Sequence, residues 1–268
     1  MTTLLLVHAH PNDESILTGG VMLHAHRDGH RVVLVTATRG EEGEVHHMDE
    51  AASRPRLGEI RSEELLAACA ILGVDRQEFL GYRDSGSAGA PSNAHPASFD
   101  SAPLGEAAAR VAVILRSERP EVVVTYTADG TYRHPDHRKA HNSTMVALDT
   151  LAGEGWAPVK LYLNAVPRSF VQGIVAVARE AGIDLPGELG QAEGVPDSEI
   201  TTEVDVCDVL DLKLAACVSH LSQMDPGLAL AAMAAQLFEA AFGTERYVLA
   251  GGVLSQHRPE RSLFAGVG

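Results

Sequence analysis

The sequence has few cysteines and no long apolar run. It contains 3 cysteines, Cys69, Cys207 and Cys217, and no two of them form a CxxC pair. This pattern argues against a disulfide framework or a cysteine-bound metal, so we interpret them as small apolar residues in a reducing compartment. No basic segment with a long apolar one opens the chain, and no apolar stretch approaches about 20 residues. We therefore expect a soluble, cytoplasmic protein without a membrane partner.

Basic residues are also scarce. The chain has 21 Lys and Arg against 36 Asp and Glu, a formal net charge of −15. This balance argues against nucleic acid as a partner and favours a neutral or cationic small molecule. A GxGxxG motif is missing after the first apolar run, and the acidic, histidine-rich turn found there would repel a pyrophosphate. The sequence therefore disfavours a dinucleotide-dependent dehydrogenase.

Short apolar runs alternate with amphipathic segments over the first part of the chain. We predict strands at residues 3–7, 31–37, 79–80, 121–126 and 159–164, and helices at residues 15–28, 57–72, 104–117 and 136–151. Strands that alternate with helices form parallel sheets with helices on both faces. We therefore expect an α/β fold with a doubly wound, mostly parallel, Rossmann-like sheet over residues 1–165.

The remainder, residues 166–268, is less regular. We predict strands at residues 200–206 and 247–250, helices at residues 174–181, 208–221 and 228–242, and an irregular Gly/Pro-rich stretch at residues 182–197. We expect this smaller α+β portion to pack on the core within one continuous domain and to shape the substrate pocket. The number of copies in the assembly is left open, homo-oligomers included.

Two clusters of histidine and acidic residues follow predicted strands. One cluster is His10–Pro11–Asn12–Asp13–Glu14, and the other runs from Tyr132 to His137 with the sequence YRHPDH. Ligands of open α/β sheets bind beyond the carboxyl ends of the strands, so the two clusters meet if their strands are neighbours. Two imidazoles and a carboxylate suit a catalytic zinc with an open position for water, and they also accommodate other divalent metals such as Fe²⁺.

AHPNDE at residues 9–14, together with TYRHPDH at residues 131–137, resembles the PIG-L (LmbE-like) superfamily of zinc-dependent N-deacetylases. Within it, the chain is most similar to the mycothiol-pathway group of N-acetylglucosaminyl-inositol deacetylases and mycothiol S-conjugate amidases. Further matches are GEEGEV at residues 40–45, RDSG at 83–86, KLAACVSHLSQ at 213–223 and YVLAGG at 247–252.

The resemblance implies a role for seven residues. His10, Asp13 and His137 match the metal ligands. His134 matches the histidine that stabilises the tetrahedral intermediate, and Tyr132 matches a tyrosine that polarises the substrate carbonyl. Arg61 and Asp84 match a pair that holds sugar hydroxyls, although the residues alone favour an exposed helix charge and a turn-forming aspartate.

Position 12 departs from the family pattern, which has HPDDE where this chain has HPNDE. The first aspartate of that motif is the general base that takes a proton from metal-bound water. An amide cannot accept this proton at neutral pH and can only orient the water. Asn12 is therefore an engineered change, the mark of an enzyme with another base such as His134 or a nearby carboxylate, or the mark of a protein with little turnover.

Our primary hypothesis is a metal-dependent amidohydrolase in which metal-bound water removes an acyl group, most simply acetyl, from an amino-sugar nitrogen. The first alternative is an amidase of a mycothiol S-conjugate or of a specialised-metabolite glycoside. Leu17 bears on the substrate, because the resemblance implies lysine at this position in the amidases and serine in the deacetylases. Leucine matches neither, so a substrate different from both stays open. The second alternative is a non-catalytic metal- and sugar-binding protein.

Overall fold

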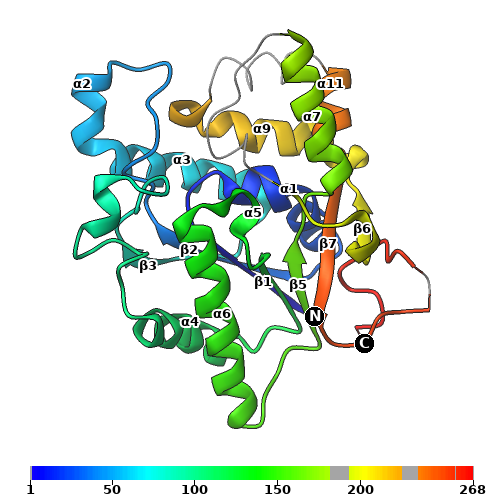
Figure 1. Cartoon of the computed structure of the whole chain (residues 1–268). Helices are drawn as coiled ribbons and strands as arrows, with labels where there is room; N and C mark the ends of the chain where they lie inside the picture. Colours follow the sequence, from blue (N-terminus) through cyan, green and yellow to red (C-terminus); the bar gives the residue numbers. More distant parts are fainter. Residues whose placement is uncertain (1, 182–192, 225–234, 257, 268) are drawn as a thin grey trace.

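The computed structural model describes residues 2–181, 193–224, 235–256 and 258–267 (Figure 1). Most of the predicted irregular stretch 182–197 and the first part of the predicted helix 228–242 therefore lie outside the described residues. The strands are β1 Thr3–His8, β2 Arg31–Thr38, β3 Arg76–Tyr82, β4 Val122–Tyr126, β5 Lys160–Asn164, β6 Thr202–Asp205 and β7 Thr244–Gly251. The helices are α1 Asp13–Arg27, α2 Glu50–Ser53, α3 Leu57–Leu72, α4 Leu104–Glu118, α5 Gly130–Arg133, α6 Pro135–Gly153, α7 Arg168–Ala181, α9 Leu210–Ser219 and α11 Ala235–Phe242.

The strands form one sheet in the order β3-β2-β1-β4-β5-β7-β6. The first five strands in this order are parallel, whereas β7 is antiparallel to both β5 and β6. The predicted α/β class with a mostly parallel sheet is confirmed. Chain order reverses between β1 and β4, and ligands of doubly wound sheets bind at such a point. The division of the chain at residue 165 stays a prediction.

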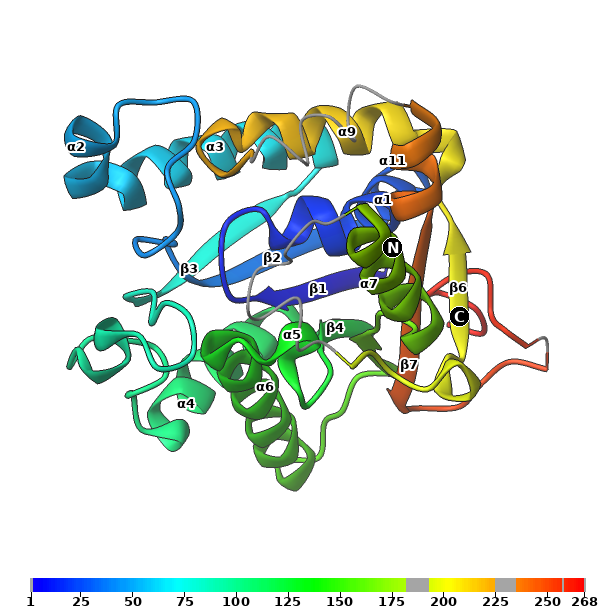
Figure 2. The same ribbon diagram turned by 45° about the horizontal axis from the view of Figure 1, so that its top comes forward.

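Helices cover both faces of the sheet, as Figure 2 shows. Helices α1, α3 and α9 pack together on one face, and α4 and α6 pack together on the other. Successive residues of a strand point to opposite faces, so a strand buried on both faces is apolar throughout. In β1, Leu4 and Leu6 enter the core below α1 and α3, while Leu5 and Val7 enter the core below α4 and α6. This is why the first apolar run has no polar alternation.

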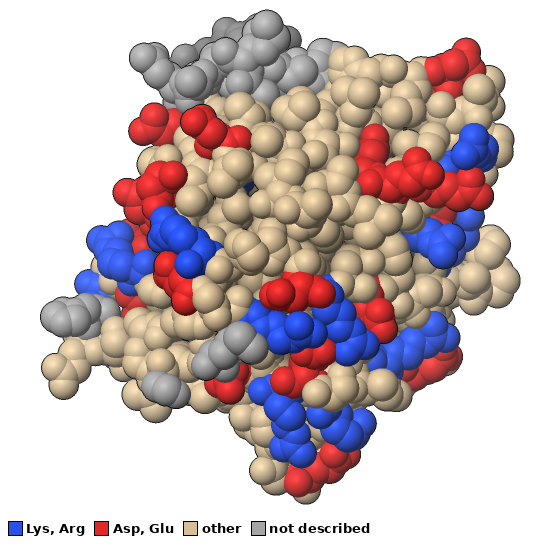
Figure 3. Space-filling view, turned by 180° about the vertical axis from the view of Figure 1, so that it is seen from behind, with Lys and Arg blue, Asp and Glu red and all other residues tan. Residues whose placement is uncertain are grey.

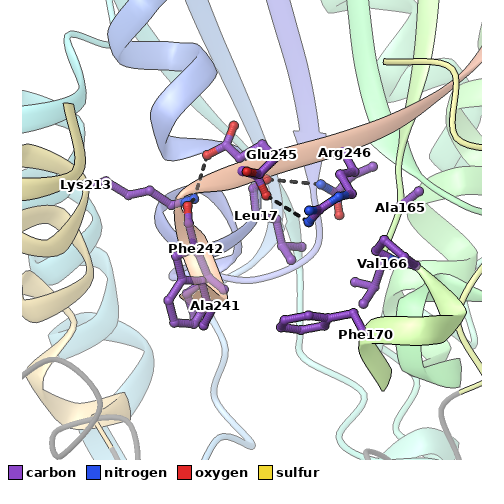
Figure 4. A pocket seen from close by; sticks show the side chains of 13 residues that line it. Leu17, Ala165, Val166, Phe170, Lys213, Ala241, Phe242, Glu245 and Arg246 are labelled. Carbon is purple, nitrogen blue, oxygen red and sulfur yellow. Dashed lines mark hydrogen bonds and ion pairs between the residues drawn. The ribbon is translucent and has the colours of Figure 1, made fainter. Parts of the chain in front are cut away.

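Helix α1, which carries Asp13 in its first turn, is tied to the sheet by Glu245 of β7. The Glu245 carboxylate accepts hydrogen bonds from the backbone N–H groups of Gly20 at 2.7 Å and Val21 at 3.0 Å. It also pairs with the ammonium group of Lys213 at 2.7 Å, and Figure 4 shows this buried pair beside a cavity of about 100 Å³. A Cβ at Gly20 would lie 2.3 Å from Val206, so this close packing requires glycine. These contacts fix the middle of α1 to β7.

Charged side chains on the surface lie next to charges of the opposite sign. On the face in Figure 3, patches of Lys and Arg adjoin patches of Asp and Glu. Glu118, for example, pairs with both Arg31 and Arg76, and these two arginines hold the pKa of Glu118 below its usual value. Within the described residues, each helix is too short or too polar to span a lipid bilayer.

Candidate metal centre and active site

The loop after β1 is shaped by hydrogen bonds between its own residues. Asp13 begins α1, and its Oδ2 accepts a hydrogen bond from the His10 backbone N–H at 2.9 Å. Asn12 has φ 104° and ψ −26°, a left-handed conformation that asparagine tolerates better than most residues. Glu14 accepts the Asn12 backbone N–H at 2.9 Å. These bonds bring His10, Asn12 and Asp13 to the carboxyl end of β1.

The second cluster lies at the carboxyl end of β4, directly beside the first. Strands β1 and β4 are hydrogen-bonded neighbours, with Leu4 paired to Val122. Tyr132 lies in a turn where Thr131 and Arg133 both have φ 68°, a conformation that costs energy for a β-branched residue such as threonine. The chain then enters α6 at Pro135, which suits the first position of a helix. The two clusters therefore meet at the carboxyl ends of the neighbouring strands β1 and β4, as predicted.

The Asp13 carboxylate lies close to one nitrogen of His10 and to one nitrogen of His137. Asp13 Oδ2 lies 3.6 Å from His10 Nδ1 and 3.5 Å from His137 Nε2. Ligand bonds of 2.0–2.2 Å in a tetrahedral site separate neighbouring ligand atoms by about 3.4 Å. The residues present therefore fit a divalent metal. Within the described part of the chain, the nitrogens of His10, His134 and His137 also lie within 4.8 Å of one another.

The hydrogen bonds of the two imidazoles engage His10 Nε2 and His137 Nδ1, so His10 Nδ1 and His137 Nε2 are the nitrogens that could bind a metal. His10 donates Nε2–H to Asp136 Oδ2 at 3.1 Å, and His137 donates Nδ1–H to the Gly130 carbonyl at 3.2 Å. Such bonds fix the tautomer and ring orientation of metal-binding histidines. In the neutral form of each ring, the nitrogen left without a proton is the one that faces Asp13.

The electrostatics of the three residues agree with this arrangement. Burial would raise the pKa of Asp13, but His137 and His10 hold it well below its usual value. Burial lowers the pKa of His137 well below its usual value, so the ring is neutral, as a metal ligand must be. Burial would also lower the pKa of His10, but the carboxylates of Asp84, Asp13 and Asp136 hold it well above its usual value. A metal ion must therefore displace a proton from His10.

His134 and Tyr132 lie against the same group. The His134 ring is centred 4.5 Å from that of His10, and its Nδ1 accepts the Asp136 backbone N–H at 3.2 Å. Since Nδ1 acts as an acceptor, the neutral form of the His134 ring carries its proton on Nε2. The Tyr132 hydroxyl lies 3.4 Å from His137 Nε2. Both side chains can therefore present a hydrogen-bond donor close to the candidate metal ligands.

Arg61 and Asp84 are more firmly engaged than exposed charges would be. Arg61 is 3% exposed and donates to the carbonyls of Pro11 and of Gly40, the latter at 2.8 Å. Its Nη2 is also 3.5 Å from Asn12 Oδ1, whereas its Nε has no partner among the described residues. Asp84 accepts the Gly86 N–H at 2.8 Å and lies 3.4 Å from His10 Nε2. Both therefore surround the first cluster, and sugar binding by them stays a prediction.

One cavity of about 190 Å³ brings most of the predicted residues together, and His137 is fully buried next to it. The predicted residues that line it are His10, Asn12, Asp13, Arg61, Asp84, Tyr132 and His134.

Two buried contacts near this cavity do not follow from the sequence motifs. Glu14 pairs with the buried His220, with 2.6 Å between Oε1 and Nε2. Tyr126, the last residue of β4, donates its hydroxyl proton to Asp13 Oδ2 at 2.6 Å. For His220 the only sequence signal is its place in the SHLSQ match, and for Tyr126 it is the strand end before the second cluster.

Comparison with known proteins assigns the family. A family model described as GlcNAc-PI de-N-acetylase matches residues 5–148. The chain is 42% identical to the 1D-myo-inositol 2-acetamido-2-deoxy-alpha-D-glucopyranoside deacetylase of Acidothermus cellulolyticus over 280 residues, covering 99% of this chain and 95% of that one. The enzyme of the same name from Thermomonospora curvata is 43% identical, with 98% and 96% covered.

The fold has solved counterparts as well. The N,N'-diacetylchitobiose deacetylase of Pyrococcus horikoshii superposes with a TM-score of 0.62 at 22% identity, covering 92% of this chain and 83% of that one. With the matched family model and the two deacetylases above, the chain belongs to the PIG-L family, the GlcNAc-PI de-N-acetylases, enzymes that act on an amide C–N bond.

Proposed function

We propose that this protein is a metal-dependent deacetylase that removes the acetyl group from the nitrogen of an N-acetylglucosaminyl-inositol. The proposal is supported by the printed activity of the relatives that match nearly the whole chain. The observation that carries it is the position of Asp13 Oδ2, 3.6 Å and 3.5 Å from one nitrogen of His10 and one of His137. The cytoplasmic location and the lack of nucleic-acid or membrane partners stay predictions.

His10, Asp13 and His137 would hold the metal. Two imidazoles and a carboxylate are a common ligand set of catalytic zinc, and Fe²⁺ accepts the same donors. When bound, a divalent metal lowers the pKa of a coordinated water and polarises the substrate carbonyl.

His134 and Tyr132 would act as hydrogen-bond donors to the carbonyl oxygen. Negative charge develops on that oxygen when the amide is attacked, and donors held in place beforehand stabilise it. The Nε2 proton of His134, which follows from its bond to the Asp136 N–H, suits this role and the later protonation of the amine. The same tautomer makes His134 a poor candidate for the missing base, because its Nδ1 is already an acceptor.

Asn12 would limit the rate. Its side chain lines the cavity beside Asp13 but cannot take a proton from water. Three other carboxylates on the cavity wall already have partners: Asp84 accepts two backbone N–H groups, Glu42 pairs with Arg83, and the exposed Glu44 pairs with His46. We therefore propose an attenuated deacetylase. A protein that binds metal and sugar without turnover is the second candidate, and Asn12 is the observation that favours it.

Arg61 and Asp84 would bind hydroxyl groups of the sugar. Both line the cavity, and together they offer a carboxylate acceptor and guanidinium donors, of which Nε has no partner within the described residues.

The experiment measures acetate release from 1D-myo-inositol 2-acetamido-2-deoxy-α-D-glucopyranoside. We expect slow release with Zn²⁺, loss of release after chelation, and recovery when Zn²⁺ is returned. His137→Ala should lose both metal and activity, because two remaining ligands rarely hold zinc. His24→Ala is the control, since His24 pairs with Asp208 at the surface and should keep both. Release that survives chelation and the His137→Ala change would contradict the proposal.

A further inference from the structure

Tyr126 touches two of the three candidate metal ligands from one buried position. Its side chain is fully buried at the carboxyl end of β4. The hydroxyl donates to Asp13 Oδ2 at 2.6 Å, and the ring stacks on the His137 imidazole with 4.1 Å between centroids and 16° between planes. Tyr126 thus contacts both the candidate carboxylate ligand, Asp13 at the start of α1, and a candidate imidazole ligand, His137 of α6.

The Tyr126 hydroxyl has three polar neighbours: the Ala9 backbone N–H, Asp13 and His8. The backbone N–H of Ala9 donates to the Tyr126 hydroxyl at 2.7 Å, so the oxygen is an acceptor there. The single hydroxyl proton goes to Asp13 Oδ2 at 2.6 Å, which as a carboxylate can only accept and lies nearer than His8 Nδ1 at 3.3 Å. The side chain therefore links the backbone after β1 to the carboxylate in a fixed direction.

We infer that Tyr126 is a positioning residue of the metal centre, which fixes the rotation of the Asp13 carboxylate by a hydrogen bond and the plane of the His137 ring by stacking. This inference rests on the metal site of the proposed function. Partners that orient metal ligands typically change metal affinity by about 10–100-fold when they are removed. Tyr126 does not itself line the cavity; it acts through Asp13, which does, and through His137.

A second buried tyrosine provides a matched control. The hydroxyl of Tyr162, on the neighbouring strand β5, donates to Glu260 Oε2 at 2.6 Å. That carboxylate pairs with the buried Lys160 at 2.6 Å. Tyr162→Phe thus removes the same group from the same kind of bond, and by this comparison any general effect of losing a buried tyrosine hydroxyl can be subtracted.

The test compares wild type, Tyr126→Phe and Tyr162→Phe as metal-free full-length proteins. The dissociation constant for Zn²⁺ is measured by competition with a chromophoric chelator. We expect Tyr126→Phe to weaken Zn²⁺ binding by about 10–100-fold and Tyr162→Phe to leave it within about twofold of wild type. Equal affinities in all three proteins would overturn the inference. If wild type itself fails to bind Zn²⁺, the proposed function fails instead.

A second measurement is used if the metal-free Tyr126→Phe protein does not fold. The absorption spectrum of each protein is recorded at saturating Co²⁺, where the bound form dominates and the bands report ligand geometry. We expect altered Co²⁺ bands in Tyr126→Phe and wild-type bands in Tyr162→Phe. Superimposable spectra would overturn the inference. A Tyr126→Phe chain that stays unfolded at saturating Co²⁺, when Tyr162→Phe folds, would assign Tyr126 a purely structural role and overturn it as well.

Discussion

Asn12 has a backbone conformation that few residue types adopt easily. Its φ of 104° suits glycine, asparagine and aspartate, because their small or locally hydrogen-bonding side chains tolerate positive φ. Glu14 holds the Asn12 N–H, and Arg61 holds the preceding carbonyl of Pro11. An aspartate at position 12 would keep this backbone and would place its charge close to the Arg61 guanidinium. The residue therefore changes the chemistry of the site without changing its shape.

Asp84 is the better test of sugar binding, because Arg61 also holds the loop. We expect Asp84→Asn to weaken binding of the N-acetylglucosaminyl-inositol about tenfold, since an unmade polar contact in a binding site costs about 1–3 kcal/mol. The asparagine oxygen can still accept the Gly86 N–H, so the turn should persist. The slow turnover expected of the wild-type chain allows the dissociation constant to be measured by calorimetry.

Asp100→Asn serves as its control, because Asp100 is exposed and lies outside the cavity that contains Asp84. Binding should stay within about twofold of wild type there. Unchanged binding in Asp84→Asn, or loss of its metal, would remove Asp84 from the sugar site.

Residues of the site differ in how far they could be predicted. His10, Asp13 and His137 lie in short motifs at strand ends, so spacing and residue type single them out. The bond between Tyr126 and Asp13 joins residues 113 positions apart, and no local pattern marks it. Such contacts depend on which strands become neighbours, which a single sequence does not reveal.

At the scale of elements, the segment after α9 contacts α1, α3 and the loop after β2. His220 pairs with Glu14, Ser222 donates its N–H and hydroxyl to Glu64 at 2.7 Å and 2.6 Å, and the Gln223 amide donates to the Glu44 carbonyl at 2.9 Å. These contacts support the predicted role of the C-terminal portion in shaping the pocket. The division of the chain at residue 165 stays a prediction.

We expect His220→Ala to lower the free energy of unfolding by about 1–3 kcal/mol, because the fully buried Glu14 carboxylate loses a partner. Urea unfolding of the metal-free protein measures the change. His24→Ala removes a comparable contact at the surface, where Asp208 is half exposed, and should cost less than about 1 kcal/mol. Equal costs for the two variants would show that the Glu14–His220 pair contributes no more than a surface pair.

Element boundaries were predicted less well than element types. Helix α1 begins at Asp13 rather than at residue 15. Two acidic side chains therefore lie in its first turn, where their negative charge interacts favourably with the positive end of the helix dipole. Strand β3 spans Arg76–Tyr82, whereas only residues 79–80 were predicted. Its charged and half-buried edge residues lack the apolar pattern of a central strand, and pairing with β2 provides the missing signal.

At the scale of the molecule, the regular alternation of strands and helices predicted the parallel core, because each crossover returns the chain in the same direction. The two C-terminal strands were predicted as strands but without neighbours. Strand β7 pairs antiparallel with β5, and β6 then pairs with β7. No short turn joins these strands, so nothing local in the sequence specifies their pairing.

The central claim is an intact metal-dependent deacetylase site that lacks its general base. Acetate release from 1D-myo-inositol 2-acetamido-2-deoxy-α-D-glucopyranoside by Zn²⁺-loaded wild type and Asn12→Asp tests it most directly. We predict equal metal content and release about 10²–10⁴-fold faster in Asn12→Asp, a barrier lower by about 3–5 kcal/mol. Equal, brisk release by both proteins would contradict the role given to position 12. No release by either, with metal bound in both, would contradict the deacetylase itself.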